Sequence, residues 1–452
     1  MEQLGLLEDI ESLAKPFGSL KVLREDLSVV TGMSDKTLDS KERYGHYNQC
    51  IPRPDLYNIL LARIPKNRLH LGKRFVNFQH INLSNPHLST ISSSGLSGSS
   101  YSLGGSEFEK IKARCSDGTF YHADILVGAD GSSSAVRQSL YRQLREEGTL
   151  PKSDQEDQQY KQVALVGVTN ALSPKKYPDL NDEFSHFKIT WLMPVAGNRY
   201  GWIITRTLDE PVTINSGNSS YADWGPDATD EMSKAVRHLA GPDGGTVGDL
   251  IDSTDRHLLS KVMLEERAFK TWYGGRTVLI GDACHKSVPF TGKGANESML
   301  DAVTLASLLY DMPPTNDLGE FHQVFRAYQQ SRASIAKQVV ETSSQVSALL
   351  VKEGWFGDLM RKAAFGLYST FMGRQRMDKI HAYRTQATFL PFVKERGSVP
   401  SKPQAQARNG LASQDHTPRC KLVGHAKPGV QEEHAQVDEF MTLGPNSVSM
   451  PM

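Results

Sequence analysis

Arg276-Thr-Val-Leu-Ile-Gly-Asp282-Ala-Cys-His-Lys-Ser-Val-Pro289-Phe-Thr-Gly292-Lys-Gly294-Ala-Asn296 is the most informative stretch of this 452-residue chain. Its apolar residues 277–280 predict a short buried strand, and a loop containing proline and glycine follows. From Asn296 onward apolar residues recur at helical spacing, which predicts a helix: Met299, Val303, Ala306 and Tyr310. A strand, a loop and a helix in this order can hold a polar ligand.

The residue types in this stretch indicate what such a ligand looks like. The Asp282 carboxylate, at the end of the predicted strand, can accept hydrogen bonds from ligand hydroxyls. Gly292 and Gly294 have no Cβ, so backbone N–H groups there can approach a ligand closely. The positive end of the predicted helix favours negative charge at the same place. The pattern suits a sugar-alcohol chain joined to a ring that becomes anionic on reduction.

Two further segments have the same character. Residues 110–115 alternate apolar and polar side chains, and Asp117-Gly118 predicts a hairpin turn. The returning strand leads into Asp124-Ile-Leu-Val-Gly-Ala-Asp130-Gly131 and then into a helical pattern that contains Arg137. Upstream, Arg53-Pro-Asp-Leu56 opens a predicted helix with proline in its first turn.

These three segments, in this order, resemble the flavin-contacting motifs of the class A flavoprotein monooxygenases. That family is typified by p-hydroxybenzoate hydroxylase and includes many fungal oxygenases of secondary metabolism. The resemblance implies that Asp282 reaches the ribityl chain of FAD, that Asp130 and Gly131 support flavin and nicotinamide-nucleotide binding, and that Arg53 contacts the cofactor. It also implies that the loop and the helix start lie against the isoalloxazine ring through Pro289, Gly292, Gly294, Ala295 and Asn296.

The resemblance implies an FAD-dependent monooxygenase that uses NAD(P)H and O2 to hydroxylate or epoxidise an aromatic, polyketide or terpenoid substrate. Because the cofactor carries the difficult chemistry, no nucleophilic triad is required, and no catalytic residue or metal ligand is assigned. Cys284 and His285 adjoin Asp282, and we expect them to pack or hydrogen-bond within the loop. Trp191, Tyr200, Trp202 and Arg206 can line a pocket, but aromatic residues alternating along a strand are more typical of a core.

One expected motif is missing from the sequence. The family begins with a strand, a Gly-x-Gly-x-x-Gly turn and a helix that together hold the pyrophosphate. Gly104-Gly105 lies in a Ser/Gly-rich loop without the required helix and cannot replace that turn. We favour an N-terminally truncated sequence over a diverged member that has lost dinucleotide binding, and we expect weak FAD binding in either case. The alternatives are a non-catalytic remnant that binds a ligand or a partner, and a flavin reductase or cyclase of the same fold.

The fold class implied by the resemblance is α/β: a Rossmann-like FAD-binding domain, N-terminally truncated, interrupted by a β-sheet substrate domain and followed by C-terminal helices. Three strands are predicted in the sheet domain, over 163–168, 186–195 and 200–207, with a turn at Gly197-Asn198. The expected division is 1–160, a partial cofactor domain with a Ser/Gly-rich insert at 84–106; 161–267, the sheet; 268–315, the cofactor domain again; 316–396, helices; and 397–452, a disordered tail.

Composition and charge limit the classes of partner. Lys plus Arg equals Asp plus Glu at 51 each, which gives no basic face for nucleic acid. The four cysteines are far apart and have no metal-binding spacing, and the first residues do not have the pattern of a secretory signal; we therefore expect an intracellular, cytoplasmic protein. The apolar stretch 346–372 contains too many charges for a spanning helix. We expect it to pack against the body, so peripheral membrane contact is possible but not favoured.

Overall fold

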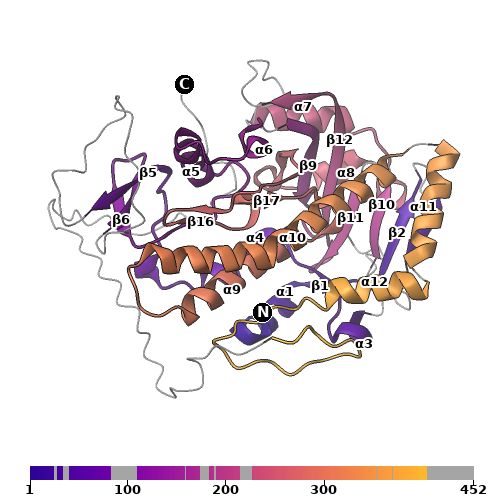
Figure 1. The fold of residues 1–452 in the computed structure, drawn as a ribbon. Helices are drawn as coiled ribbons and strands as arrows, with labels where there is room; N and C mark the ends of the chain where they lie inside the picture. The colour runs from indigo at the N-terminus through magenta and orange to yellow at the C-terminus, as the bar shows by residue number, and fades with distance from the viewer. Residues whose placement is uncertain are drawn as a thin grey trace.

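The computed structural model describes residues 1–24, 28–33, 40–82, 109–157, 159–173, 183–187, 190–213, 226–352, 354–368 and 370–404. The predicted insert at 84–106 lies outside these ranges, as does the predicted tail from residue 405 onward. The longest helix, α10 (Leu318–Val351), runs along most of the molecule and connects the two regions that are described next (Figure 1).

A seven-stranded sheet forms one region, in the order β13-β9-β12-β11-β10-β2-β3. Its strands are β2 (Ser19–Leu23), β3 (Val29–Met33), β9 (Gln159–Val168), β10 (Glu183–Phe187), β11 (Thr190–Val195), β12 (Arg199–Thr213) and β13 (Ser260–Leu264). Neighbouring strands are antiparallel except β10 and β2, which are parallel. The sheet takes β2 and β3 from the part of the chain assigned above to the cofactor domain, and the domain boundaries remain a prediction.

The predicted strands of the sheet domain are found with one correction. The strands at 163–168 and 200–207 are confirmed within β9 and β12. The single strand predicted over 186–195 is wrong, because Phe187 pairs with Thr190 and the segment is two antiparallel strands, β10 and β11. Gly197 and Asn198 both have positive φ, 79° and 54°, as the predicted turn between β11 and β12 requires.

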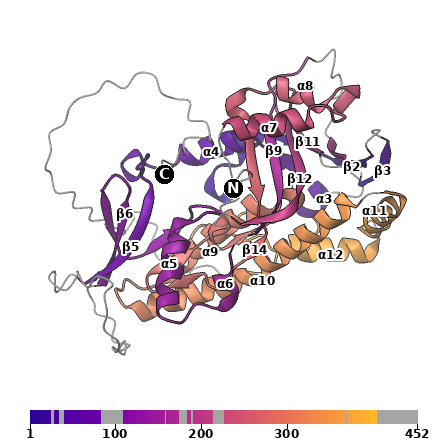
Figure 2. The same ribbon diagram turned by 90° about the horizontal axis from the view of Figure 1, so that it is seen from above.

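One face of this sheet is covered by α7 (Pro226–Val236) and α8 (Val247–Asp252), as Figure 2 shows. The core beneath them centres on Trp202, which is fully buried and donates a hydrogen bond from Nε1 to Thr254 Oγ1 at 3.0 Å. A Cβ on Gly167 of β9 would lie 2.5 Å from the Trp202 ring, so the indole occupies the space that a side chain would need. Trp202 and Tyr200 are therefore core residues.

The second region contains the predicted strand–loop–helix. β16 (Thr277–Leu279) pairs in parallel with β8 (Leu126–Gly128) and antiparallel with β15 (Tyr273–Gly274). A second sheet of β5 (Phe75–Asn82), β6 (Glu109–Cys115) and β7 (Phe120–Ala123) contains the predicted hairpin. Helix α9 (Gly294–Asp311) begins two residues before the predicted start, and α5 (Ala135–Glu146) follows the Asp130 segment.

The remaining elements are short except near the C-terminus. They comprise α1 (Leu7–Leu13), β1 (Lys15–Pro16), α3 (Ser40–Tyr44), β4 (Gln49–Cys50), α4 (Arg53–Leu61), α6 (Lys152–Gln155), β14 (Arg267–Ala268), β17 (His285–Lys286), α11 (Gly354–Tyr368) and α12 (Phe371–His381), with 3₁₀ turns at Glu2–Leu4, Lys66–Arg68, Pro242–Gly244 and Arg256–Leu258. Among the residues described, no helix has both the length and the apolarity needed to cross a bilayer.

The helix predicted from apolar spacing near 321–339 is confirmed as α10, and its inner face enters the core of the second region. Phe325 is fully buried there, between α10 and the strands that carry Tyr273 and Val278. We expect Phe325→Ala to lower the free energy of unfolding by about 3–5 kcal/mol, because it leaves a cavity in a packed core. Phe356 is a helix residue that is 53% exposed, so Phe356→Ala should change the free energy of unfolding by less than about 0.5 kcal/mol. Urea denaturation of both variants measures the difference.

Candidate cofactor-binding site

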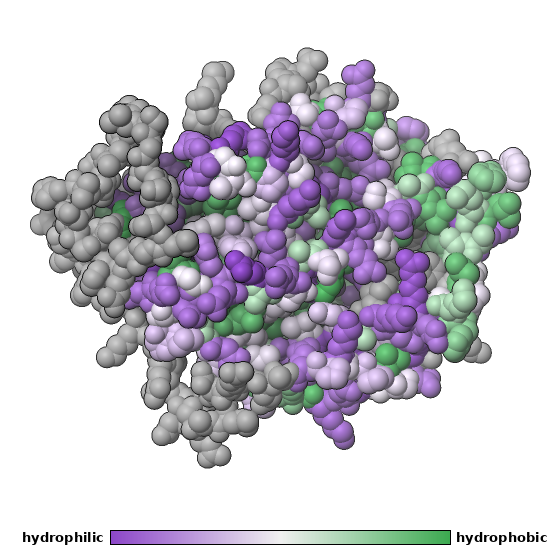
Figure 3. All heavy atoms as spheres, viewed as in Figure 1, coloured by the Kyte–Doolittle hydropathy of each residue, from purple (hydrophilic) through white to green (hydrophobic). Residues whose placement is uncertain are grey.

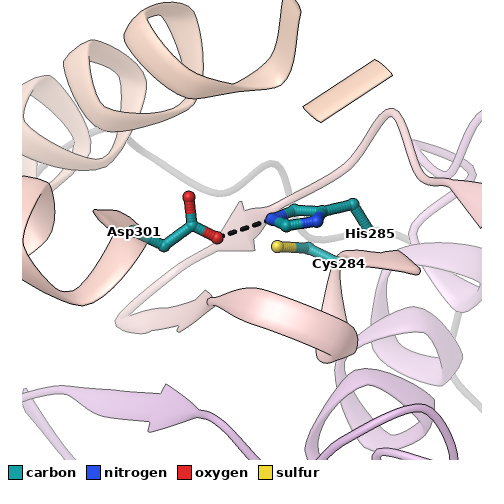
Figure 4. Close-up of side chains that lie close together, drawn as sticks. All are labelled: Cys284, His285 and Asp301. Carbon is teal, nitrogen blue, oxygen red and sulfur yellow. Dashed lines mark hydrogen bonds and ion pairs between the residues drawn. The ribbon is translucent and has the colours of Figure 1, made fainter. Parts of the chain in front are cut away.

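The Asp282 loop is held by a buried carboxylate, Asp301 of α9 (Figure 4). Asp301 Oδ2 accepts a hydrogen bond from the Gly281 backbone N–H at 2.9 Å and contacts His285 Nε2 at 2.6 Å. Its other oxygen accepts a hydrogen bond from Arg332 Nε of α10 at 2.7 Å. The loop after β16 is thus fixed between α9 and α10 by one side chain.

Burial makes this network strong and vulnerable. Asp301 is 0% exposed and Arg332 is 1% exposed, so each charge depends on its partner. Arg332 also donates to Glu297 Oε2 at 2.5 Å. Burial alone would raise the pKa of Asp301, but the hydrogen bond from His285 and the charge of Arg332 outweigh it and hold that pKa below its ordinary value.

Cys284, His285 and Asp301 lie close enough together to be considered as metal ligands. Metal binding requires a thiolate, and burial together with the negative Asp301 raises the pKa of the Cys284 thiol well above its ordinary value. The Asp301 oxygens are already occupied by Gly281, His285 and Arg332. The cluster is therefore a hydrogen-bonding network, in agreement with the expectation that Cys284 and His285 are residues of the loop.

The backbone of the loop is shaped for close packing. Gly281 has φ of 59°, and a Cβ there would lie 2.7 Å from the Ser298 hydroxyl. Tyr328 donates to the Leu279 carbonyl at 3.2 Å, and Ser343 donates to the Val288 carbonyl at 2.6 Å. Both donors come from α10, which therefore supports the strand end and the loop along its length.

Asp282 and the glycines of the loop, unlike Asp301, have groups that are open to a ligand. The Asp282 carboxylate is half-buried and makes no hydrogen bond to any residue that the structure describes. Gly292 ends the 3₁₀ turn Pro289–Thr291 with φ of 62°, and a Cβ on it would meet nothing within 4 Å. The buried Thr291 hydroxyl lacks a hydrogen-bond partner within the described residues. A free acceptor, an open glycine backbone and an unsatisfied hydroxyl fit the ribityl and ring end of a flavin.

The other predicted loop residues surround the start of α9. Gly294 is its first residue, Ala295 is exposed, and Asn296 Nδ2 donates to the Gly292 carbonyl at 3.4 Å. Lys293, between the two glycines, is half-buried, and burial lowers its pKa against the opposing effect of Glu297. A cation at this helix start was not assigned any role from the sequence.

Asp130 and Gly131 meet the loop through Arg137 of α5. Asp130 accepts hydrogen bonds from the Ser134 hydroxyl and from the Val136 backbone N–H, so this carboxylate stabilises the first turn of α5. Gly131 has φ of 82° with open space at its Cβ position. Arg137 donates to the Ser132 carbonyl at 2.5 Å and to the Ala283 carbonyl at 2.8 Å, which joins the two predicted motifs.

Lys286 identifies where the motifs converge. Burial lowers its pKa, while Asp282 and Glu265 raise it and Arg137 and Arg53 lower it further. Arg53, exposed at the start of α4, is therefore close enough to Lys286 to act on its charge. The sequence analysis assigned no role to Lys286 or Arg137; their positions close to Asp282 and to Asp130-Gly131 in the sequence were the signal that could have found them.

The described residues contain no Gly-x-Gly-x-x-Gly turn of the kind that would hold the pyrophosphate of FAD. β8 is an edge strand of its three-stranded sheet, and Val127 on it is 37% exposed. A hollow of about 310 Å³ lies elsewhere, between Tyr273 and the α10 residues Arg326, Gln329, Gln330 and Ala333. None of the predicted cofactor contacts lines it.

Comparison with known proteins agrees with this geometry. The family model described as "FAD binding domain" matches residues 107–343, which is more than half of the chain. The chain belongs to this FAD-binding family. It is 27% identical over 379 residues to the FAD-dependent monooxygenase ptmM of Penicillium ochrochloron, covering 81% of this chain and 80% of the relative. It is 25% identical over 407 residues to atmM of Aspergillus flavus, covering 88% and 77% respectively.

Solved structures of two other proteins share the fold. HpxO of Klebsiella pneumoniae, complexed with FAD and uric acid, superposes with a TM-score of 0.57 at 18% identity, covering 84% of this chain and 83% of HpxO. A salicylate hydroxylase gives 0.55 at 19% identity, covering 84% and 85%. The α/β fold, the flavin cofactor and the class of FAD-dependent monooxygenase predicted from the sequence are confirmed.

Asp301→Asn tests the network that supports the loop. The folded-state pKa of Asp301 lies below its ordinary value of 3.8, so its charged form stabilises the protein at neutral pH, and this contribution is lost as acid protonates it. We expect a loss of about 3–5 kcal/mol at pH 7, because Arg332 keeps a buried charge, and a smaller difference from the wild type below pH of about 4. Urea denaturation across pH measures both.

The exposed Asp311, on the same helix, provides the control for that experiment. Asp311→Asn should stay within about 0.5 kcal/mol of the wild type at every pH. An Asp301→Asn curve that runs parallel to the wild-type curve down to pH 2 would contradict the assignment of the stabilising charge to Asp301.

Proposed function

We propose that this protein uses FAD, NAD(P)H and O2 to hydroxylate or epoxidise an apolar organic substrate of the aromatic, polyketide or terpenoid class. The observation that carries the proposal is the join between two of the predicted flavin motifs: Arg137, on the helix after Asp130-Gly131, donates to the Ser132 carbonyl and to the Ala283 carbonyl beside Asp282. One structural neighbour is complexed with uric acid and another is a salicylate hydroxylase. Both names refer to planar organic molecules, which supports a planar organic substrate for this protein.

The core that joins the sheet to the glycine loop is apolar. Trp191 of β11 lies 5.4 Å from Phe290 of the loop, measured between ring centroids. Both belong to one cluster that joins the sheet to the loop, with Val22, Ala164, Leu264, Val288 and Leu350. An apolar core that reaches the glycine loop supports the proposal of an apolar substrate beside it.

Several residues of the loop and of α9 would hold the ring and ribityl end of the cofactor. Bound FAD supplies the redox and oxygen-transfer chemistry. Asp282 would accept hydrogen bonds from ribityl hydroxyls, and the backbone around Gly292 and Gly294 would contact the ring, where the α9 N-terminus favours negative charge. Lys286 and Lys293 would add positive charge at this end, and Arg53, which acts on the charge of Lys286, would contact the cofactor on the same side. These roles of Arg53, Asp130, Gly131, Asp282, Pro289, Gly292, Gly294, Ala295 and Asn296 form part of the proposal.

A second candidate function is a non-catalytic protein that retains a ligand or partner site. The observation that favours it is the lack of a dinucleotide turn among the residues the structure describes, with β8 at the edge of its sheet. We also propose an intracellular location, supported by the free thiols of Cys50, Cys115 and Cys284.

Flavin titration tests the cofactor roles. We expect the 452-residue protein to bind FAD and FMN with similar affinity, because the contacts assigned above serve the ring and ribityl chain that both share. Asp282→Ala should weaken both by about 10- to 100-fold, the loss of one or two hydrogen bonds to a charged acceptor. Asp311→Ala is the matched control and should bind as the wild type does. Equal affinity of Asp282→Ala and wild type would refute the role of Asp282.

Turnover tests the reaction. The flavin-loaded protein should oxidise NADPH with matching O2 uptake, and an accepted substrate should gain one oxygen atom, measured by mass spectrometry with ¹⁸O2. NADPH oxidation without oxygen incorporation into any member of a panel of aromatic and terpenoid compounds would favour a reductase. A protein that remains colourless at saturating flavin would favour the non-catalytic candidate.

A further inference from the structure

The C-terminal helices expose an unusual number of large apolar side chains. On α11, Trp355 is 78% exposed and Leu367 is 57% exposed; at the start of α12, Phe371 and Met372 are 75% and 70% exposed. Phe356 and Leu359 of α11 are also exposed. We name these six residues the α11–α12 patch. In Figure 3 an apolar surface covers this end of the molecule.

The patch lies on the outer face of a helix that is firmly attached on its inner face. Residues 355, 359, 362, 366 and 367 follow helical spacing on the outside, while Gly357 and Arg361 are buried on the inside. Arg361 donates to the Lys352 carbonyl at 2.6 Å, and a Cβ on Gly357 would lie 2.5 Å from that same oxygen. The expected packing against the body is therefore correct for one face of α11, and the apolar outer face remains in solvent.

The charges around the patch are mainly positive. Residues 352–379 contain six basic and three acidic side chains. Two of the acids are engaged in ion pairs, Asp358 with Arg24 and Arg361, and Asp378 with Arg43. The exposed bases are Lys352, Lys362, Arg374, Arg376 and Lys379. Lys362 lies within the apolar face itself, one helical turn from Leu359.

This combination selects among possible partners. Aromatic side chains beside lysine and arginine are typical of segments that lie in the interface of an anionic bilayer. Lysine is depleted in the core of protein–protein interfaces. A second copy of this chain would also bring two positive patches together, which costs energy at low salt. Charge and composition both favour a lipid surface.

We propose that the α11–α12 patch docks this protein on an anionic membrane surface. Trp355, Phe356 and Phe371 enter the interface between headgroups and acyl chains, and the surrounding bases contact the lipid phosphates and carboxylates. This attachment requires neither the flavin nor turnover, so it stands independently of the proposed reaction.

The position of the patch relates membrane docking to the candidate site. Phe365, on the inner side of α11, packs against the cluster that contains Trp191 and Phe290. The patch is therefore on the outer side of a helix whose inner side joins the apolar core next to the glycine loop. A substrate that partitions into lipid would be concentrated beside the enzyme, which agrees with the apolar class proposed above.

Vesicle co-sedimentation of the full 452-residue protein, without added flavin, tests the docking. We expect binding to phosphatidylcholine vesicles containing 30% phosphatidylserine, and much weaker binding to phosphatidylcholine alone or in 0.5 M salt. Trp355→Ser/Phe371→Ser should reduce the partition coefficient by about tenfold or more. Lys362→Gln/Arg376→Gln should reduce it by roughly fivefold for each charge removed, on anionic vesicles only.

Matched controls separate the patch from general stickiness. Leu71→Ser/Phe120→Ser changes two residues that are 59% and 53% exposed, outside the α11–α12 patch, and should bind as the wild type does. Thermal melts confirm that each variant is folded. Brominated lipid should quench the wild-type tryptophan fluorescence, and Trp355→Phe should lose that quenching while it keeps most of the binding.

Three results would overturn the proposal. The first is no binding to anionic vesicles. The second is equal binding by the patch variants and the wild type, which would place the contact elsewhere in the chain. The third is a dimer, measured by light scattering, that Trp355→Ser/Phe371→Ser dissociates; the patch would then be an interface between two copies.

Discussion

The Asp301 carboxylate is the constraint on which the candidate site depends. Its two oxygens bind the Gly281 backbone, His285 and Arg332, and so join the end of β16, the start of β17 and α10 to α9. A buried charge of this kind is stable only while all its partners are in place. The loop that carries Asp282 is consequently held in one conformation by a carboxylate whose two oxygens are both engaged within the protein.

The acidic residues differ in whether their carboxylates have hydrogen-bond partners within the protein, and this difference separates structural carboxylates from one that can bind a ligand. Asp301 is fully paired, and Asp130 stabilises the first turn of α5. Asp282, in the loop that Asp301 supports, makes no side-chain hydrogen bond to the described residues and acts on the charge of the half-buried Lys286. Leaving the Asp282 acceptor without a partner among the described residues, beside an open glycine backbone, costs stability. Such a cost is typical of sites that are completed by a ligand.

Local patterns predicted most of what they could determine. The strand, glycine loop and helix around Asp282 depend on short-range signals, and the structure has them to within two residues. The error at 186–195 arose because alternation continues through Lys188-Ile189, where no Gly, Asn or Pro indicates a turn. The pairing of Asp301 with Arg332, 31 residues apart, follows from how α9 packs on α10. One sequence does not determine such a packing, nor the link from Arg137 to Ala283.

The charged residues of the stretch 346–372 have one meaning in the sequence and another in the structure. The stretch 346–372 is too polar to cross a bilayer, because it contains Lys352, Asp358, Arg361 and Lys362. From the sequence, these charges favoured packing of the stretch against the body of the protein. In the structure Arg361 and Asp358 form the inner, anchoring face, while Lys362 stands among apolar side chains on the outside. A helix whose polar residues fasten it to the protein and whose apolar face meets solvent reverses the usual amphipathic arrangement. A membrane surface accepts both apolar rings and cations, and it therefore suits this combination of exposed side chains.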